Sequence, residues 1–477
     1  MVSSTHAELI LATCILGIAI VTQRRNLACP LDMDFFDIAL AATGVFFGLG
    51  AWAAFFYGDW SFVEDAWVSR EPVDRLVSAY WIIGSFMGTL WLCNWLLMSL
   101  DRNDLEGIPK CRRYSMAEYF HQCHRVDWGC ILAIYLMVYA VRLIIVLKYG
   151  ILFSGTSTPE RVSSLPYSIV ILSQVGEILS VGCLVWASVW SARQRWERWF
   201  SLGVLLLEAV WAFAHGRRWF LAWLLIALLG SLASGWRVRL RQLVVMGLVI
   251  FVVAAAVFPF FTSIRHAYYF RQPSKDIGAV QNFAGAAASA AKGNPTILYK
   301  IYKRNMATRP LFLRAFVCDI CRGLDRREPM MGTALVSTFR SAIPSAVLPE
   351  KNSALEGEQL IQAHFCLPIQ DSASTWPAFG CADFGRTIGG ICVGIVLSFW
   401  ILLMACWCDV LKACHPFVML CLAGATITCL LQVEEGPSAC WIMARNLFIL
   451  VVGAVVLFLV QYFAVPARSH VCAGCNE

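Results

Sequence analysis

Long apolar runs recur along nearly the whole 477-residue chain, and short polar or charged stretches separate them. A helical run of roughly 20 apolar residues crosses the ~30 Å hydrocarbon core of a bilayer. The pattern therefore predicts an all-α fold, a polytopic transmembrane helical bundle of about eleven spans. The predicted spans are residues 7–22, 36–56, 76–98, 128–148, 166–190, 198–214, 219–235, 242–262, 386–408, 415–432 and 446–465.

The composition agrees with a membrane protein. The chain is 59% apolar and 14% charged, with a mean hydropathy of +0.65, whereas soluble domains carry about 25% charged residues. The first apolar run has no basic region before it, which favours a first transmembrane helix or signal anchor over a cleavable signal peptide. Most of the twenty cysteines lie in apolar runs, where cysteine behaves as a small apolar residue.

The charges of the loops alternate along the chain. Loops after odd-numbered spans are rich in base, whereas short loops after even-numbered spans, such as 57–75 and 432–439, are poorer in base and acid-rich. By the positive-inside rule the N-terminus is outside, and the tail 466–477 is cytoplasmic. The basic residues are Arg24, Arg25, Arg102, Lys110, Arg112, Arg113, Arg125, Arg193, Arg195, Arg198, Arg237, Arg239, Arg241 and Lys412.

One long segment, residues 263–385, separates spans 1–8 (residues 1–262) from spans 9–11 (residues 386–465), and we expect it outside. It holds fourteen Lys and Arg from Arg265 to Lys351, against eight Asp and Glu from Asp276 to Asp371. Long loops escape the positive-inside rule, so this excess suggests an anionic partner, either phospholipid headgroups or a phosphate-bearing substrate.

Local patterns divide this segment. Residues 295–323 mix apolar and basic positions and predict one or two interfacial helices, broken near Pro310. Residues 337–390 are rich in proline, glycine and polar side chains and read as an ordered loop. The stretch TIGGICVGIVLS, 387–398, is typical of close helix packing.

Three charges lie inside predicted spans and away from the span ends: Arg142, Glu177 and Glu208. Because intramembrane charges are costly, they normally face the bundle interior and pair. Arg142 would pair with Glu177 or with Glu208. The alternatives are a polar wall beneath an outward-facing cavity, or an Arg142 side chain that reaches the outer interface.

The stretch FAHGRRWF, 213–220, is a tight external turn carrying Arg217 and Arg218. These arginines either anchor the turn in the headgroup layer beside Trp211 and Trp219 or bind a phosphate group. Phosphate loops, dinucleotide fingerprints and the common hydrolase motifs are absent from the sequence, as is a cytoplasmic Asp-x-Asp. The Cys-x-x-Cys spacings at 318–321 and 472–475 lack a second pair or a partner histidine, so they do not indicate a metal site.

Several features together resemble the O-antigen polymerases, the oligosaccharide repeat-unit polymerases distantly related to O-antigen ligases. They are Gly216-Arg217-Arg218 at an external turn, the basic stretch FFTSIRHAYYFRQ after span 8, and a large external loop. The loop contains IPSAVLPEKN, IQDSAST and FGCADFGRTIGG. The resemblance covers the motifs of residues 200–400 and the layout of the whole chain, and it implies a GT-C-like glycosyltransferase in the bacterial inner membrane.

The implied reaction polymerises oligosaccharide repeat units carried on polyprenyl diphosphate, at the outer face of the membrane. Arg217, Arg218, Arg265 and Arg271 would hold the diphosphate through forked, permanently charged donors, and no metal or other cofactor is required. His364 and Asp371 are the candidate bases for the acceptor hydroxyl, and His266 is a third. His121 and His124 lie on the cytoplasmic side and read as surface residues.

Other functions fit the same features. An O-antigen ligase shares the chemistry, a lipid-linked sugar flippase or transporter would also need interior charge, and a scaffold would use the basic loop to bind anionic polymer. The expected partners are the lipid-linked oligosaccharide, membrane lipids, and a chain-length regulator or export complex, with no nucleic acid.

Overall fold

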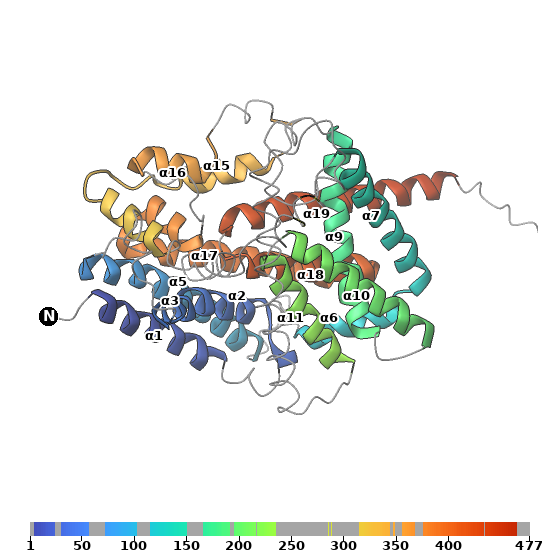
Figure 1. Cartoon of the computed structure of the whole chain (residues 1–477), viewed down its shortest axis with the longest axis horizontal. Helices are drawn as coiled ribbons and strands as arrows, with labels where there is room; N and C mark the ends of the chain where they lie inside the picture. Colours follow the sequence, from blue (N-terminus) through green and yellow to red (C-terminus); the bar gives the residue numbers. More distant parts are fainter. Residues whose placement is uncertain are drawn as a thin grey trace, which may run out of the picture.

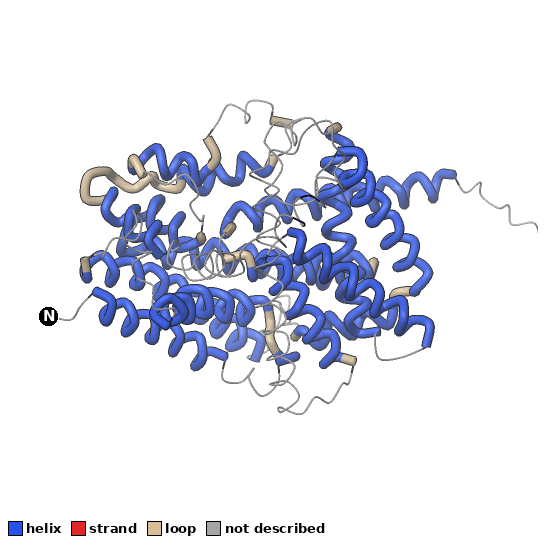
Figure 2. The backbone as a smooth tube through the Cα atoms, viewed as in Figure 1, coloured by secondary structure: helices blue, strands red, loops and turns tan. Residues whose placement is uncertain are grey.

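The computed structural model describes residues 4–23, 30–56, 72–102, 115–149, 166–190, 195–215, 217–234, 285, 288, 314–343, 347–348, 355–367, 375–433 and 435–464. Every regular element in these ranges is helical, as Figure 2 shows. Predicted span 8 (242–262), Arg265, His266, Arg271, Asp371, Cys472 and Cys475 lie outside the described residues.

The helices follow the apolar runs closely. In chain order they are α1 (Ser4–Gln23), η1 (Pro30–Asp32), α2 (Phe35–Gly44), the π-helical η2 (Val45–Leu49), α3 (Gly50–Phe56), α5 (Val73–Arg102), α6 (Met116–His121), η3 (Gln122–Arg125), α7 (Trp128–Tyr149), α9 (Tyr167–Trp190), α10 (Arg195–His215), α11 (Arg217–Ala233), α15 (Thr333–Ala342), α16 (Gly357–Phe365), α17 (Trp376–Cys414), α18 (Pro416–Leu431) and α19 (Gly436–Ala464). Residues 314–323 are also helical.

Among the described residues, five helical segments are long and apolar enough to cross a membrane. They are Phe35–Trp52, Val73–Ser99, Trp128–Lys148, Ser168–Trp190 and Trp376–Lys412. Shorter apolar helices cover His6–Thr22, Ala222–Ala233, Pro416–Leu431 and Gly436–Val452. The helix over the predicted span 198–214, α10, belongs to neither group and carries Glu197, Arg198 and Glu208.

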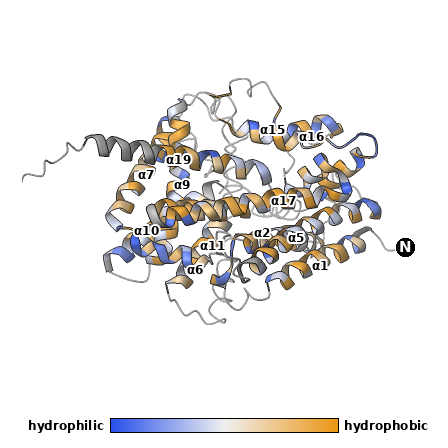
Figure 3. Cartoon of the chain, turned by 180° about the vertical axis from the view of Figure 1, so that it is seen from behind, coloured by the Kyte–Doolittle hydropathy of each residue, from blue (hydrophilic) through white to orange (hydrophobic). Residues whose placement is uncertain are grey.

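The most extensive contact between two of the described helices is that of α17 with α5, which lie side by side in Figure 1. Two glycines allow this approach. A Cβ atom on Gly390 would lie 2.2 Å from the Ile82 carbonyl oxygen of α5, and one on Gly394 would lie 2.8 Å from Thr89 Cβ. Small residues let helix backbones approach closely in membranes, so the packing role predicted for 387–398 is confirmed. Figure 3 shows α17 to be mostly hydrophobic along its length.

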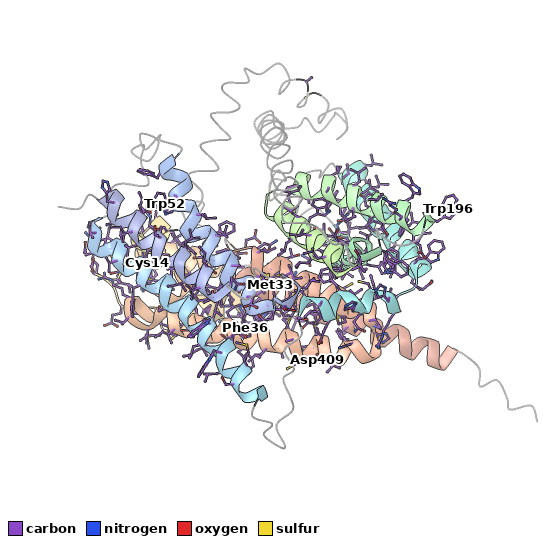
Figure 4. All side chains as sticks on the ribbon, turned by 90° about the horizontal axis from the view of Figure 1, so that it is seen from below. Cys14, Met33, Phe36, Trp52, Trp196 and Asp409 are labelled. Atoms are coloured by element: carbon purple, nitrogen blue, oxygen red, sulfur yellow. The ribbon has the colours of Figure 1, made fainter. Side chains whose placement is uncertain are left out.

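A second group of helices, α7, α9, α10 and α11, packs beside α18. The first turns of α10 are at the edge of this group, where Trp196 is 86% exposed and Trp199 is 67% exposed. Figure 4 shows Trp196 at the periphery of the molecule, whereas the buried Phe36 lies near its centre. Exposed tryptophans near a helix end are typical of a membrane–water interface.

The prediction of an irregular loop over 337–390 is wrong, because much of it is helical in α15, α16 and the first part of α17. Local signals start these helices: the Thr375 hydroxyl accepts a hydrogen bond from Ala378 N at 3.2 Å, and Glu356 and Gln359 form a capping box. Burial against the bundle further stabilises these helices, since Ile361, Ala378 and Phe379 belong to one buried cluster with Leu76 and Ile82 of α5.

The chain reverses sharply inside α17, at Gly385. This residue has φ +82° and ψ −175°, which favours glycine. The segments before and after it pack so closely that a Cβ atom on Gly380 would lie 2.4 Å from the Gly389 carbonyl oxygen. Residues 376–384 therefore form a short helix that folds back on the long helix beginning at Arg386.

Candidate functional site

The described residues from 314 to 384 form a helical layer, called the cap below. It comprises residues 314–323, α15, α16 and residues 376–384, and it packs on the first turns of α5. In Figure 1, α15 and α16 lie together beside α17 and α5. Because α15 also packs against α19, the cap joins the beginnings of several bundle helices.

A buried ion pair ties the cap to the first helix. Arg314 Nε lies 2.8 Å from Glu8 Oε1 of α1, and the two side chains are only 4% and 5% exposed. Removing one partner of such a pair leaves an uncompensated buried charge, at a cost of about 3–5 kcal/mol. The pair therefore specifies where the cap docks.

Asp383, within the FGCADFG motif of the resemblance, holds the start of α15. Its carboxylate is fully buried and accepts hydrogen bonds from Ala334 N at 3.0 Å and Leu335 N at 2.9 Å. A carboxylate at a helix N-terminus satisfies unpaired N–H groups and complements the helix dipole. These contacts give Asp383 a structural role that the sequence did not reveal.

The residue after the reversal, Arg386, forms a partly exposed ionic contact. Its guanidinium donates hydrogen bonds to Asp325 and to the Cys321 carbonyl oxygen, and Arg75 lies 4.0 Å from Asp325. The hydrogen bond from Arg386 lowers the pKa of the Asp325 carboxyl below its usual value. This contact holds residues 314–323 beside the Gly385 reversal.

His364, a predicted base, is half-buried on the last turn of α16. Its Nε2 lies 3.0 Å from the Glu328 carbonyl oxygen, and its ring packs edge-on against Phe365. A carbonyl oxygen only accepts, so Nε2 carries the proton in the neutral ring and Nδ1 holds the lone pair. Arg327 donates to the His364 carbonyl oxygen. In the role predicted for His364, Nδ1 is therefore the ring nitrogen that would accept the proton.

The intramembrane charges meet between α7, α9 and α10. Arg142 Nη1 lies 2.6 Å from Glu208 Oε1, and the two side chains are 8% and 7% exposed. Arg142 therefore pairs with Glu208, one of the two partners considered. Glu177 of α9 contributes its backbone carbonyl, which accepts from Ser180 Oγ at 2.9 Å.

Further groups complete this polar cluster. Arg142 Nη2 donates to Ser180 Oγ at 2.8 Å, and the Tyr135 hydroxyl donates to Glu208 Oε1 at 3.1 Å. The Arg142 guanidinium also lies 4.4 Å from the ring centre of Trp211. Such cation–π contacts contribute about 2 kcal/mol when desolvated. The cluster thus joins three helices through one arginine.

Arg445 is a further arginine inside a long apolar helix. The sequence analysis did not identify it as an intrahelical charge, because span 11 was predicted to begin at residue 446. In the structure α19 begins at Gly436, so Arg445 lies inside the helix. Its Nη2 donates to Gln174 Oε1 of α9 at 2.7 Å, and its Nη1 donates to the Ala342 carbonyl oxygen of α15 at 3.4 Å. The available signal was a charged residue in the apolar stretch WIMARNLFIL.

Arg217 and Arg218, two of the residues predicted to bind the diphosphate, lie at the junction of α10 and α11. Helix α10 ends at His215 and α11 begins at Arg217, so Arg217 and Arg218 occupy the first turn of α11. The side chains of both arginines lie outside the described residues. On the other side of the bundle, His121 and His124 are exposed on α6 and η3.

Comparison with known proteins identified no matching family model, curated protein or solved structure.

Proposed function

We propose that this chain is a polytopic membrane glycosyltransferase that polymerises oligosaccharide repeat units carried on polyprenyl diphosphate. One observation carries the proposal: Arg217 and Arg218 open α11 directly after α10 ends. The N-terminus of a helix offers unpaired N–H groups and a positive dipole end, which favour an anion. Two arginines there add cationic charge where the dipole disfavours it, and a bound diphosphate would offset both.

The proposed enzyme is a bundle of eleven spans with a GT-C-like architecture, and the positions of the described helices fit the span count. Ten of the eleven predicted spans overlap described helices, and the remaining one, 242–262, is outside the described residues. The mixture of long apolar helices with a helical cap at one end fits an enzyme that receives a lipid-linked substrate beside the membrane surface.

Contacts between helix ends support the proposed sidedness. The predicted outer ends lie together: Arg314 of the cap pairs with Glu8 near the start of α1. The predicted inner ends also meet, since Lys412 Nζ of α17 lies 3.8 Å from Glu118 Oε2 of α6. These contacts fit an outside N-terminus and a cytoplasmic C-terminus in the inner membrane.

In the proposed reaction an acceptor sugar hydroxyl attacks the anomeric carbon of the donor, and the lipid diphosphate leaves. Arg217 and Arg218, with Arg265 and Arg271, stabilise the charge that grows on the diphosphate. The acceptor proton goes to a base, for which His364 Nδ1 and the Asp371 carboxylate are the candidates.

The proposal is tested with purified protein in lipid vesicles that contain lipid-linked repeat units and a metal chelator. We expect the glycan to lengthen by whole repeat units, as measured by gel electrophoresis and mass spectrometry. Transfer of a single glycan to a different lipid acceptor without elongation would identify a ligase. Translocation of the substrate without any new glycosidic bond would contradict the glycosyltransferase.

A lipid-linked sugar flippase is the second candidate, and one observation favours it. The π-helical turn Val45–Leu49 interrupts the α-helix over predicted span 2. Interruptions within spanning helices are typical of the binding sites of transporters. The vesicle assay separates the two functions because only the transferase forms new glycosidic bonds.

A further inference from the structure

Two cysteine thiols face each other inside the cap. Cys321 Sγ and Cys381 Sγ are 3.5 Å apart, and both side chains are fully buried. Cys321 lies on the helical residues 314–323 and Cys381 on the helical residues 376–384. The pair therefore joins the first helix of the cap to the helix that precedes the Gly385 reversal.

The surroundings hold the two helices in this arrangement. Arg386, directly after the reversal, donates a hydrogen bond to the Cys321 carbonyl oxygen. Phe316, Ala378 and Phe379 belong to the same buried cluster. Formation of the bond shortens the separation of the sulfur atoms from 3.5 Å to about 2.05 Å.

A shared metal ion does not account for the pair. Cys318 lies one helical turn from Cys321, but its thiol donates towards the Arg75 carbonyl oxygen, 3.9 Å away. Within the described ranges, no group of three or more His, Cys, Asp or Glu side chains is arranged to hold a metal ion. Two facing thiols without a metal are suited to a disulfide.

We propose that Cys321 and Cys381 form a disulfide that locks the first helix of the cap, residues 314–323, to residues 376–384 at the start of α17. The proposal rests on the external location of the cap in the proposed function, because disulfides persist in oxidising compartments. Each thiol loses a proton as one S–S bond forms, and the two electrons reduce the disulfide of an external thiol–disulfide oxidant protein to two thiols.

The burial of the pair dictates when the bond forms. A protein oxidant cannot reach two fully buried sulfur atoms, so oxidation precedes docking of the cap. For the same reason the bond resists reductant in the folded protein and yields only when denaturant is added. The disulfide thus covalently closes the chain between residues 321 and 381 before the cap packs.

The test uses the full chain in its own membranes. Cells are quenched in acid, free thiols are alkylated with N-ethylmaleimide in denaturant, and the protein is digested with trypsin without reduction. We expect a linked pair of peptides, 315–322 and 352–386, in the majority of molecules, and its loss after reduction. These peptides also hold Cys318 and Cys366, so the double variant Cys318→Ser/Cys366→Ser should keep the link.

Two matched variants locate the bond: Cys321→Ser and Cys381→Ser should each abolish the link. Alkylation of both Cys321 and Cys381 in the quenched wild-type protein would overturn the proposal. Treatment of isolated membranes with copper phenanthroline then shows whether the compartment is the premise that failed. A link formed only there means that the cap faces a reducing compartment, and without a link there the alkylation result alone overturns the proposal. Elongation activity is measured separately and does not enter either result.

Discussion

Two buried arginine–carboxylate ion pairs of similar geometry lie in different parts of the molecule. In the bundle, Arg142 and Glu208 are 2.6 Å apart, and Ser180, Tyr135 and Trp211 surround them. Beneath the cap, Arg314 and Glu8 are 2.8 Å apart and connect a segment between spans to the first helix. Both pairs are almost fully buried, so both make the loss of one partner costly.

The difference lies in what each pair holds. Under the membrane interpretation, α7 and α10 stay inserted through their apolar surfaces, and the Arg142–Glu208 pair selects which helices pack together. The cap has no such insertion, so its position depends on the contacts it makes with α1, α5 and α19. Breaking the cap pair should therefore release a local layer, whereas breaking the bundle pair should loosen helix packing.

The largest effect is expected from Arg314→Met, which leaves the buried Glu8 carboxylate without its guanidinium partner. We expect a loss of about 3–5 kcal/mol, seen as a lower melting temperature in detergent and faster tryptic cleavage within the cap. The double variant Glu8→Gln/Arg314→Met should recover most of this loss. The control is Arg322→Met, whose side chain is 43% exposed. Equal cleavage of the Arg314→Met protein and the wild type would contradict the docking role.

A smaller loss is expected from Glu208→Gln in the bundle. The glutamine oxygen still accepts a hydrogen bond from Arg142, and Arg142 keeps its contacts with Ser180 and Trp211. The free energy of unfolding should therefore fall by about 1.5–3 kcal/mol, the range for a hydrogen bond to a charged group. Melting in detergent measures it, and Ser99→Ala, whose hydroxyl bonds within its own helix, is the control. A larger loss than that of Arg314→Met would reverse the comparison between bundle and cap.

Arg218→Lys extends the comparison to an arginine whose proposed partner is a substrate. Lysine keeps the charge but lacks the planar fork, so melting should be unchanged while the elongation rate falls. Loss of one charge-assisted contact, about 1.5–3 kcal/mol, corresponds to roughly a ten- to hundred-fold slower rate. Arg217→Lys should be milder, and Arg198→Lys, at the other end of α10, should be neutral. Normal elongation by the Arg218→Lys protein would leave the turn as a membrane anchor.

The smallest effect is expected from Asp325→Asn at the exposed contact with Arg386 and Arg75. Because the pKa of Asp325 is lowered in the folded protein, its contribution to stability is fully present above the unfolded value of about 3.9 and is lost as the pH falls from that value through the lower folded pKa. The melting temperatures of wild type and variant should differ slightly at neutral pH and converge below about pH 4. A constant difference across this range would show that the carboxylate charge is not responsible.

The sequence by itself determined the approximate positions of the long apolar helices. A spanning helix satisfies its backbone hydrogen bonds internally and needs an apolar run of defined length, so both requirements are visible in the order of residues. The close packing of residues 387–398 and the helix junction at FAHGRRWF were also predictable, because the spacing of glycines and a polar break between two apolar runs are visible locally in the sequence. The helices α15 and α16 were not, because their burial against the bundle outweighs a composition rich in proline and polar residues.

Only the tertiary structure decided which side chains meet. The sequence left Arg142 with two possible partners, and α7 and α10 both pack against α9 so that Arg142 pairs with Glu208. It contained no sign that Arg314 would meet Glu8, that Asp383 would hold the start of α15, or that Cys321 would face Cys381. These contacts join residues far apart in the chain, and their geometry depends on how whole helices pack, which local apolar and charge patterns do not specify.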